Sequence, residues 1–221
     1  MVGALSLRDR LIVSIFFVAA LGSIAFWGFS TYLSFTKPVA KNGGHYVEGM
    51  VSQPRYINPI LAQTSDADAA LSRLIYAGLF TPGAQGLPEK NIASDYTLSE
   101  DGKLITVYLK TGVRFHDGQE LTAEDVVFTI RAIQDPAYKS PLRNDWLGVE
   151  ASAPERYTVV FSLKKPYFGF LENLTIGILP KHLWEPIPAD RFTLADYNLL
   201  QPIGAGPYRF RAIDKDAEGN I

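Results

Sequence analysis

The sequence contains no cysteine and only three histidines among its 221 residues. Without cysteine there is no disulfide framework, no thiolate nucleophile, no Cys-ligated zinc and no lipid attached through an N-terminal cysteine. An excess of one charge is also lacking, because 21 Lys and Arg stand against 23 Asp and Glu, for a net charge of -2. No strong positive field is available to a phosphate backbone, so we expect no nucleic-acid partner.

The short motifs of common catalytic sites are missing as well. His45, His116 and His182 lie far apart, and none belongs to an H-E-x-x-H pair. Neither a G-x-S-x-G elbow nor a G-x-x-x-x-G-K-[ST] phosphate loop occurs. His116-Asp117-Gly118 could form a catalytic His-Asp pair, but a turn after a strand over 113–115 is the simpler interpretation. The sequence therefore predicts no enzyme, no cofactor and no metal site.

A long apolar run stands near the N-terminus. No charged residue occurs between Arg10 and Lys37, and residues 11–29 are interrupted only by two serines and two glycines. At about 1.5 Å per residue, a helix of this run is roughly 28 Å long, close to the thickness of a bilayer core. The hydrophobic part of a cleavable signal peptide is usually shorter, about 7–15 residues. The run therefore predicts an uncleaved transmembrane anchor, with a cleaved signal sequence and a buried core helix as alternatives.

The anchor divides the chain into four predicted parts. Residues 1–10 form a cytoplasmic N-terminus, 11–32 the anchor, 33–44 a Pro- and Gly-containing linker and 45–221 a folded domain. Arg8 and Arg10 precede the anchor, but Asp9 lies between them, so the charge pattern favours an external C-terminal part only weakly. Trp27 and Tyr32 would lie at the outer interface. We expect a single-pass protein of the plasma membrane.

The folded part alternates short strands and helices. Thr122 with Asp125 predicts a capping box, followed by an apolar stripe and a stop at Pro136. Ser65 with Asp68 predicts a second helix start, with Leu71, Leu74 and Ile75 on one face and an end at Gly78. Strands are predicted over 45–52, 104–109, 157–163 and 208–213, with turns over 81–86 and 100–103.

Two short motifs have more than one interpretation. Gly204-Ala205-Gly206 begins like a dinucleotide-binding fingerprint, but Pro207 follows it and a tight turn explains it better. Asp66 and Asp68 are spaced like the start of a calcium loop without its glycine and its later glutamate, so helix capping is favoured.

Longer segments of the folded part resemble a known family. They resemble the extracytoplasmic solute-binding proteins of ABC importers, in the oligopeptide, dipeptide and nickel class, over roughly residues 45–213. The segment from Lys110 to Phe128 is the most specific. The segments occur in the family's order, and they are residues 74–80, 92–96, 109–118, 121–129 and 202–208.

The resemblance implies an α/β fold of the type II periplasmic-binding-protein class. The expected part is the first lobe with its subsidiary subdomain, preceded by one transmembrane helix, while the second lobe lies outside this chain. In the family, the loop before the first helix pairs with ligand, which corresponds here to Gln63, Thr64 and Ser65. Asp145 and Trp146 lie near an aromatic wall of the ligand cavity. For two of these residues a structural role is the alternative to ligand contact: Ser65 would cap a helix, and Trp146 would be an ordinary core aromatic.

The resemblance further implies a substrate-binding subunit that captures peptides or a similar extended solute for ABC permease subunits. It implies no bond chemistry in the binding protein itself. Two other classes stay open from the residues alone. One is a sensor or hydrolase on the same scaffold, with its activity in an absent C-terminal part, and the other is a structural surface protein with a closed cleft.

Overall fold

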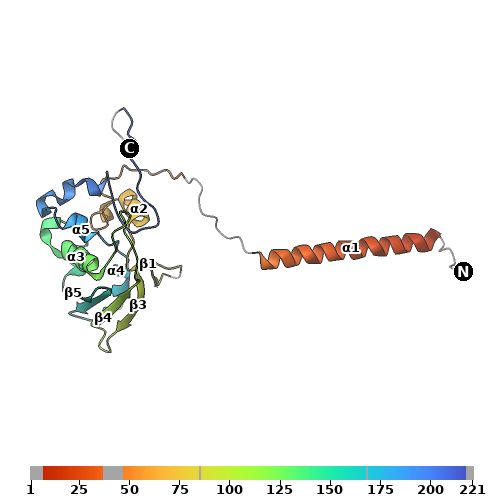
Figure 1. The fold of residues 1–221 in the computed structure, drawn as a ribbon, viewed down its shortest axis with the longest axis horizontal. Coiled ribbons are helices and arrows are strands. Elements are labelled where there is room, and N and C mark those ends of the chain that lie inside the picture. The colour runs from red at the N-terminus through yellow and green to blue at the C-terminus, as the bar shows by residue number, and fades with distance from the viewer. Residues whose placement is uncertain (1–6, 37–46, 85, 168, 218–221) are drawn as a thin grey trace. The chain divides into compact units, whose positions relative to one another are not determined.

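The computed structural model describes residues 7–36, 47–84, 86–167 and 169–217 of the chain (Figure 1). The chain divides into two units, residues 1–48 and 49–221, and each is described here by itself. Most of the predicted linker and the start of the predicted first strand lie outside the described residues.

The first unit contains one long helix, α1, over Leu7–Phe35. Its apolar side chains are exposed along its length, which contradicts the alternative of a buried core helix. Ser23, Thr31 and Ser34 donate their hydroxyl hydrogen bonds to carbonyls four residues earlier, at 2.9, 2.7 and 2.9 Å. Their polar groups are therefore satisfied inside the helix, as an apolar environment requires. By length and composition α1 can cross a membrane, and a signal sequence has the same properties.

The second unit is built on a four-stranded antiparallel sheet in the order β3-β4-β6-β5. Its strands are β3 (Ala93–Leu98), β4 (Leu104–Leu109), β5 (Val149–Glu155) and β6 (Thr158–Leu163). The predicted strand over 104–109 is confirmed, and so is the one over 157–163 apart from its first residue. In β4, Ile105, Val107 and Leu109 are buried in alternation, as expected of a sheet with one covered face.

Helix α3 (Ala123–Gln134) packs against β5 and β6 (Figure 1). Its capping box is present as predicted, because Asp125 accepts the Thr122 N–H at 2.8 Å and the Thr122 side chain receives the backbone N–H of Asp125. The predicted stripe, Val126, Val127, Ile130 and Ile133, is buried. Local sequence and tertiary packing therefore agree over this helix.

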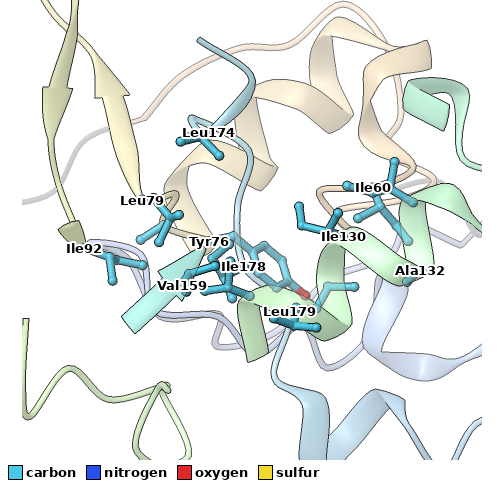
Figure 2. Close-up of a cluster of buried hydrophobic side chains, with 14 of the residues drawn as sticks. Ile60, Tyr76, Leu79, Ile92, Ile130, Ala132, Val159, Leu174, Ile178 and Leu179 are labelled. Carbon is cyan, nitrogen blue, oxygen red and sulfur yellow. The ribbon is translucent and has the colours of Figure 1, made fainter. Parts of the chain in front are cut away.

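Shorter elements complete the unit. A two-stranded hairpin, β1 (Phe80–Pro82) with β2 (Pro88–Lys90), stands apart from the main sheet. Figure 2 shows part of the hydrophobic core, including Ile60, Tyr76, Leu79 and Ile178. The remaining helices are α2 (Asp66–Ile75), α4 (Phe170–Asn173), α5 (Lys181–Trp184), η1 (Ala62–Thr64), η2 (Pro136–Tyr138), η3 (Pro141–Trp146), η4 (Ala189–Leu194) and η5 (Asp196–Asn198).

The predicted helix over 65–78 was wrong at its end and at one position of its face, while Leu71 and Ile75 of that face do pack against the core. Helix α2 ends at Ile75, because the chain beyond it pairs with distant backbone: Gly206 donates to the Ile75 carbonyl at 2.8 Å. Ser65 occupies the N-cap position, but its side chain makes no capping bond. Leu74, expected on the buried face, is 40% exposed. Tertiary pairing thus overrides the helical pattern.

Three predicted strands and one turn also differ from the structure. Within the described residues 47–52 there is no strand, and none forms over 208–213, since neither segment has a neighbouring ladder to join. The strand expected over 113–115 is reduced to a single bridge between Arg114 and Glu120. The turn expected over 81–86 begins later, because Thr81 and Pro82 belong to β1.

Candidate functional site

The second unit contains two large grooves of different composition. We call the first the ion-pair groove; it has a volume of about 850 Å3 and lies between the start of α3, the loop between β5 and β6, and α5. We call the second the glycine groove; it has a volume of about 620 Å3 and is lined by parts of α2, β1, η3 and α4, and by residues 175–177 and 205–207.

The charges of the ion-pair groove contact one another. Lys181 Nζ lies 2.8 Å from Glu124 Oε2, and Arg156 Nη2 lies 2.9 Å from Glu120 Oε2. The hydrogen bond with Lys181 lowers the pKa of Glu124, and the same bond raises the pKa of Lys181. The pKa of Glu120 is lowered, first by the Tyr157 hydroxyl and then by Arg156. These shifts all favour the charged forms, as expected of side chains that are held in ion pairs.

His116 and Asp117, the two residues of the possible catalytic pair, contact different partners and not each other's side chains. His182 Nε2 lies 2.7 Å from Asp117 Oδ2. Burial by itself raises the pKa of Asp117, but hydrogen bonds from His182 and from the Gln119 N–H outweigh it and lower that pKa. His116 instead holds residues 204–206: the Gly204 N–H points to its Nδ1 at 3.4 Å, and its Nε2 donates to the Gly206 carbonyl at 3.0 Å. The turn interpretation of residues 116–118 is confirmed.

Two backbone segments that are far apart in the chain, around Gly78 and around Gly177, pair within the glycine groove, and we call this pair its floor. Gly78 and Gly177 form an antiparallel bridge, and Ile178 donates to the Ala77 carbonyl at 2.9 Å. A Cβ atom on Gly78 would lie 2.5 Å from the Thr175 carbonyl oxygen, and one on Gly177 would lie 2.5 Å from Tyr76 Cβ. The segments can approach this closely only because both positions lack a side chain.

The walls of the glycine groove include three of the five predicted ligand residues. Gln63, Asp145 and Trp146 line it, although 82 residues separate Gln63 from Asp145 in the chain. Thr64 and Ser65 do not line it. Trp146 is only 2% exposed, and its ring packs edge-on against Phe170 with 5.7 Å between the centroids. It is therefore a core aromatic whose edge also reaches the groove.

Sequence reasoning missed other residues of this groove. Gly177 was not singled out, and Gly78 was interpreted only as the end of a helix, because a close approach of two backbones leaves no local pattern. Arg73 and Glu172 were missed as well, since a charged residue on a helix is ordinarily a solvated one. A glycine between two apolar residues, as in Ile176-Gly177-Ile178, is the only signal that pointed to such an approach.

Among the described residues, no group of three or more Asp, Glu and His side chains could hold a metal ion. What the glycine groove offers instead is a concave surface lined by closely paired backbone segments, a mostly buried tryptophan and a few polar side chains. Such a surface can bind an extended solute by hydrogen bonds and shape, without bond chemistry.

Residues 88–218, more than half of the chain, match the family model for bacterial extracellular solute-binding proteins, family 5, middle part. The chain belongs to this family. The predicted family is thus confirmed, and the relatives that it matches are binding proteins rather than enzymes, in agreement with the expectation from the sequence.

The relatives include proteins of known structure. The chain is 31% identical to the oligopeptide-binding protein AppA of Bacillus subtilis, over 94% of this chain and 38% of AppA. The ABC transporter substrate-binding protein CtaP of Listeria monocytogenes is 34% identical, with a TM-score of 0.70 over 79% of this chain and 35% of CtaP. NikZ of Campylobacter jejuni, solved in complex with Ni(L-His), is 30% identical, with a TM-score of 0.66 over 76% of this chain and 32% of NikZ.

These structures confirm the predicted α/β fold of the peptide-binding class. The chain spans between 32% and 38% of the length of these relatives.

Proposed function

We propose that the chain is the N-terminal part of a membrane-anchored substrate-binding subunit that captures peptides or similar extended solutes for an ABC importer. The observation that carries this proposal is the backbone floor of the glycine groove, in a chain similar to an oligopeptide-binding protein. In this proposal ABC permease subunits are the protein partners, and they supply the energy for transport.

A backbone floor suits an extended ligand for a physical reason. A peptide presents one donor and one acceptor at each residue, whatever its side chains, and edge backbone groups can pair with them. Gln63, Asp145 and Trp146 would then contact ligand side chains from the walls. Thr64 and Ser65, which precede α2, would contact the ligand only where it extends beyond the groove.

The proposal includes anchoring through α1. Residues 11–32 would span the plasma membrane once, with residues 1–10 in the cytoplasm and residues 33–44 as a spacer to the extracytoplasmic domain over 45–221. The exposed apolar surface of α1 and its internally bonded hydroxyl groups support this assignment. Intact-mass measurement of the protein from alkali-washed membranes tests it. Retention of residues 1–36 is expected, and a soluble product that begins after α1 would contradict the anchor.

The experiment that tests capture is mass spectrometry of the small molecules that accompany the protein. The protein, expressed at the full length of its gene, is purified from membranes without added ligand and then denatured to release bound solutes. We expect peptides in stoichiometric amount. A preparation that retains no solute, or one that converts the solute during incubation, would contradict the proposal.

The segment 45–221 alone supplies a second test. A half-site leaves its polar groups in water and gains no contacts on closure, so its affinity should be far lower than that of a two-lobed protein. Calorimetry with a peptide is expected to show no saturable binding by this segment. Micromolar binding would show that one lobe is sufficient.

A further inference from the structure

The charged side chains of the glycine groove differ from those of the ion-pair groove, because they lack partners among the described residues. Three charged residues line this groove: Arg73 from α2, Asp145 from η3 and Glu172 from α4. None of their side chains makes a hydrogen bond or an ion pair within the part of the chain that the structure describes. Their charges are therefore available to a solute.

The ion-pair groove provides the comparison. Every charged or ionisable residue that lines it has a partner among the described residues, so a ligand there would have to break an existing contact. These residues are Arg114, Glu120, Glu124, Asp125, Glu155, Arg156, Lys181, His182 and Glu185. The same unit thus pairs its charges in one groove and leaves them unpaired in the other.

Packing brings the elements of the two carboxylates together. The ring of Trp146, next to Asp145, lies against the ring of Phe170, which begins the short helix that carries Glu172. Two negative side chains therefore come from two elements in direct contact, while the one positive side chain comes from α2. The charged residues of the groove sum to about one negative charge at neutral pH.

We propose that Asp145 and Glu172 select solutes that carry a cationic side chain, and that Arg73 binds a carboxylate of the same solute. This inference rests on the proposed function, because it assigns the substrate class of the same groove. The favoured solutes are peptides that contain Lys or Arg and have a free carboxylate. Peptides with a neutral side chain of similar size bind the same backbone floor with lower affinity.

The expected difference in affinity between cationic and neutral peptides is that of ion pairs exposed to solvent. Each pair in a partly hydrated groove changes affinity by about fivefold, which corresponds to roughly 1 kcal/mol. Salt screens such pairs, so the preference should decline between 0.05 and 1 M NaCl, over which the Debye length falls from more than 10 Å to about 3 Å.

The test is a competition between matched peptides on the full-length protein. Alanine pentapeptides with lysine at one of the five positions are mixed in equal amounts with the same peptides containing norleucine. The peptides retained by the protein are then measured by mass spectrometry. We expect the lysine peptides to be retained about fivefold or more over the norleucine peptides. D145N and E172Q are each expected to lower this ratio several-fold.

The control is E150Q, which removes an exposed carboxylate of β5 outside both grooves and should leave the ratio unchanged. For Arg73 the probe is a lysine peptide with a free carboxylate against the same peptide as its C-terminal amide. R73Q is expected to abolish the preference for the free carboxylate. All three groove positions are exposed, so the variants should melt at the temperature of the parent.

Each outcome decides one of the two proposals. Equal retention of lysine and norleucine peptides would overturn the charge inference and leave peptide capture intact. The charge inference would also be overturned if E150Q lowered the ratio of lysine to norleucine peptides as much as E172Q does. The preference would then come from the overall charge of the protein. Retention of neither peptide by the parent would contradict peptide capture itself.

Discussion

The ion-pair groove and the glycine groove lie on the same folded unit and use charge in opposite ways. In the ion-pair groove, which is the larger of the two at about 850 Å3, ion pairs join α5 to α3 and the turn between β5 and β6 to the segment before α3. In the glycine groove, at about 620 Å3, backbone hydrogen bonds hold the segments together. The charged side chains that line it have no partner among the described residues. Volume alone would favour the ion-pair groove. The unpaired charges favour the glycine groove, which is the binding surface that we propose.

The largest expected effect concerns Asp125, which lines the ion-pair groove and is 5% exposed. Its carboxylate accepts the backbone N–H of Thr122 at 2.8 Å and that of Lys181 at 2.9 Å. D125A removes a helix cap and leaves a second, partly buried donor unpaired, at a cost of about 2–4 kcal/mol. Thermal unfolding of the 45–221 segment should show a fall of at least several degrees.

The neighbouring carboxylate supplies the control for this prediction. Glu124 lies on the same helical turn but is exposed and bonds only to Lys181. E124Q should therefore unfold close to the temperature of the parent. If D125A did the same, the structural role of the ion-pair groove would be wrong.

The next effect tests the floor of the other groove. G78A places a methyl group where the Thr175 carbonyl oxygen is 2.5 Å away, so one of the two backbones must move. Such overpacking costs about 1–3 kcal/mol. Displacement of the floor should also reduce peptide retention by the full-length protein. G49A, at a position with no atom within 4 Å, is the matched control and should change neither property.

How far the sequence predicts this fold depends on where the partners of each segment lie. Helix α3 and its capping box were predicted because Thr122, Asp125 and the apolar stripe lie within one segment. The end of α2 was not, because its backbone partners are Gly206 and Tyr208, more than 130 residues away. Local propensity contains no information about such pairing, so boundaries set by tertiary contacts are missed.

The same reasoning applies to the candidate site. Trp146 and Asp145 were reached through the resemblance to a family, which carries three-dimensional information that the residues alone lack. Arg73 and Glu172 belong to no motif, and they differ from the charges of the ion-pair groove in having no partner among the described residues. A missing partner can be recognised only in a structure.

A change of pH is expected to have a smaller effect on the free energy of unfolding. The pKa of Asp117 is lowered in the folded chain, so its contribution to stability is present above the unfolded pKa of about 3.9 and is lost as pH falls through the lower folded pKa. D117N keeps an oxygen for the Gln119 N–H and removes the charge that faces His182. The parent should exceed D117N in stability at pH 6 by less than about 1 kcal/mol. Urea unfolding from pH 6 to pH 2 should show this difference disappear below pH 4, and a difference that persisted at pH 2 would rule out the ion pair as its origin.

The smallest expected effect sharpens the comparison most directly. Lys181 is a basic residue of the ion-pair groove with two acidic neighbours, Glu124 at 2.8 Å and Glu185 at 3.8 Å. K181Q leaves both carboxylates without their cation and makes the ion-pair groove more negative. If unpaired acidic charge on any part of the surface attracted cationic peptides, this variant would retain more lysine peptide than the parent does. Because the glycine groove is unchanged, we expect the ratio of lysine to norleucine peptides to stay the same within the error of the measurement. A ratio that rose in K181Q would assign peptide selection to the ion-pair groove, since only there has the charge been changed.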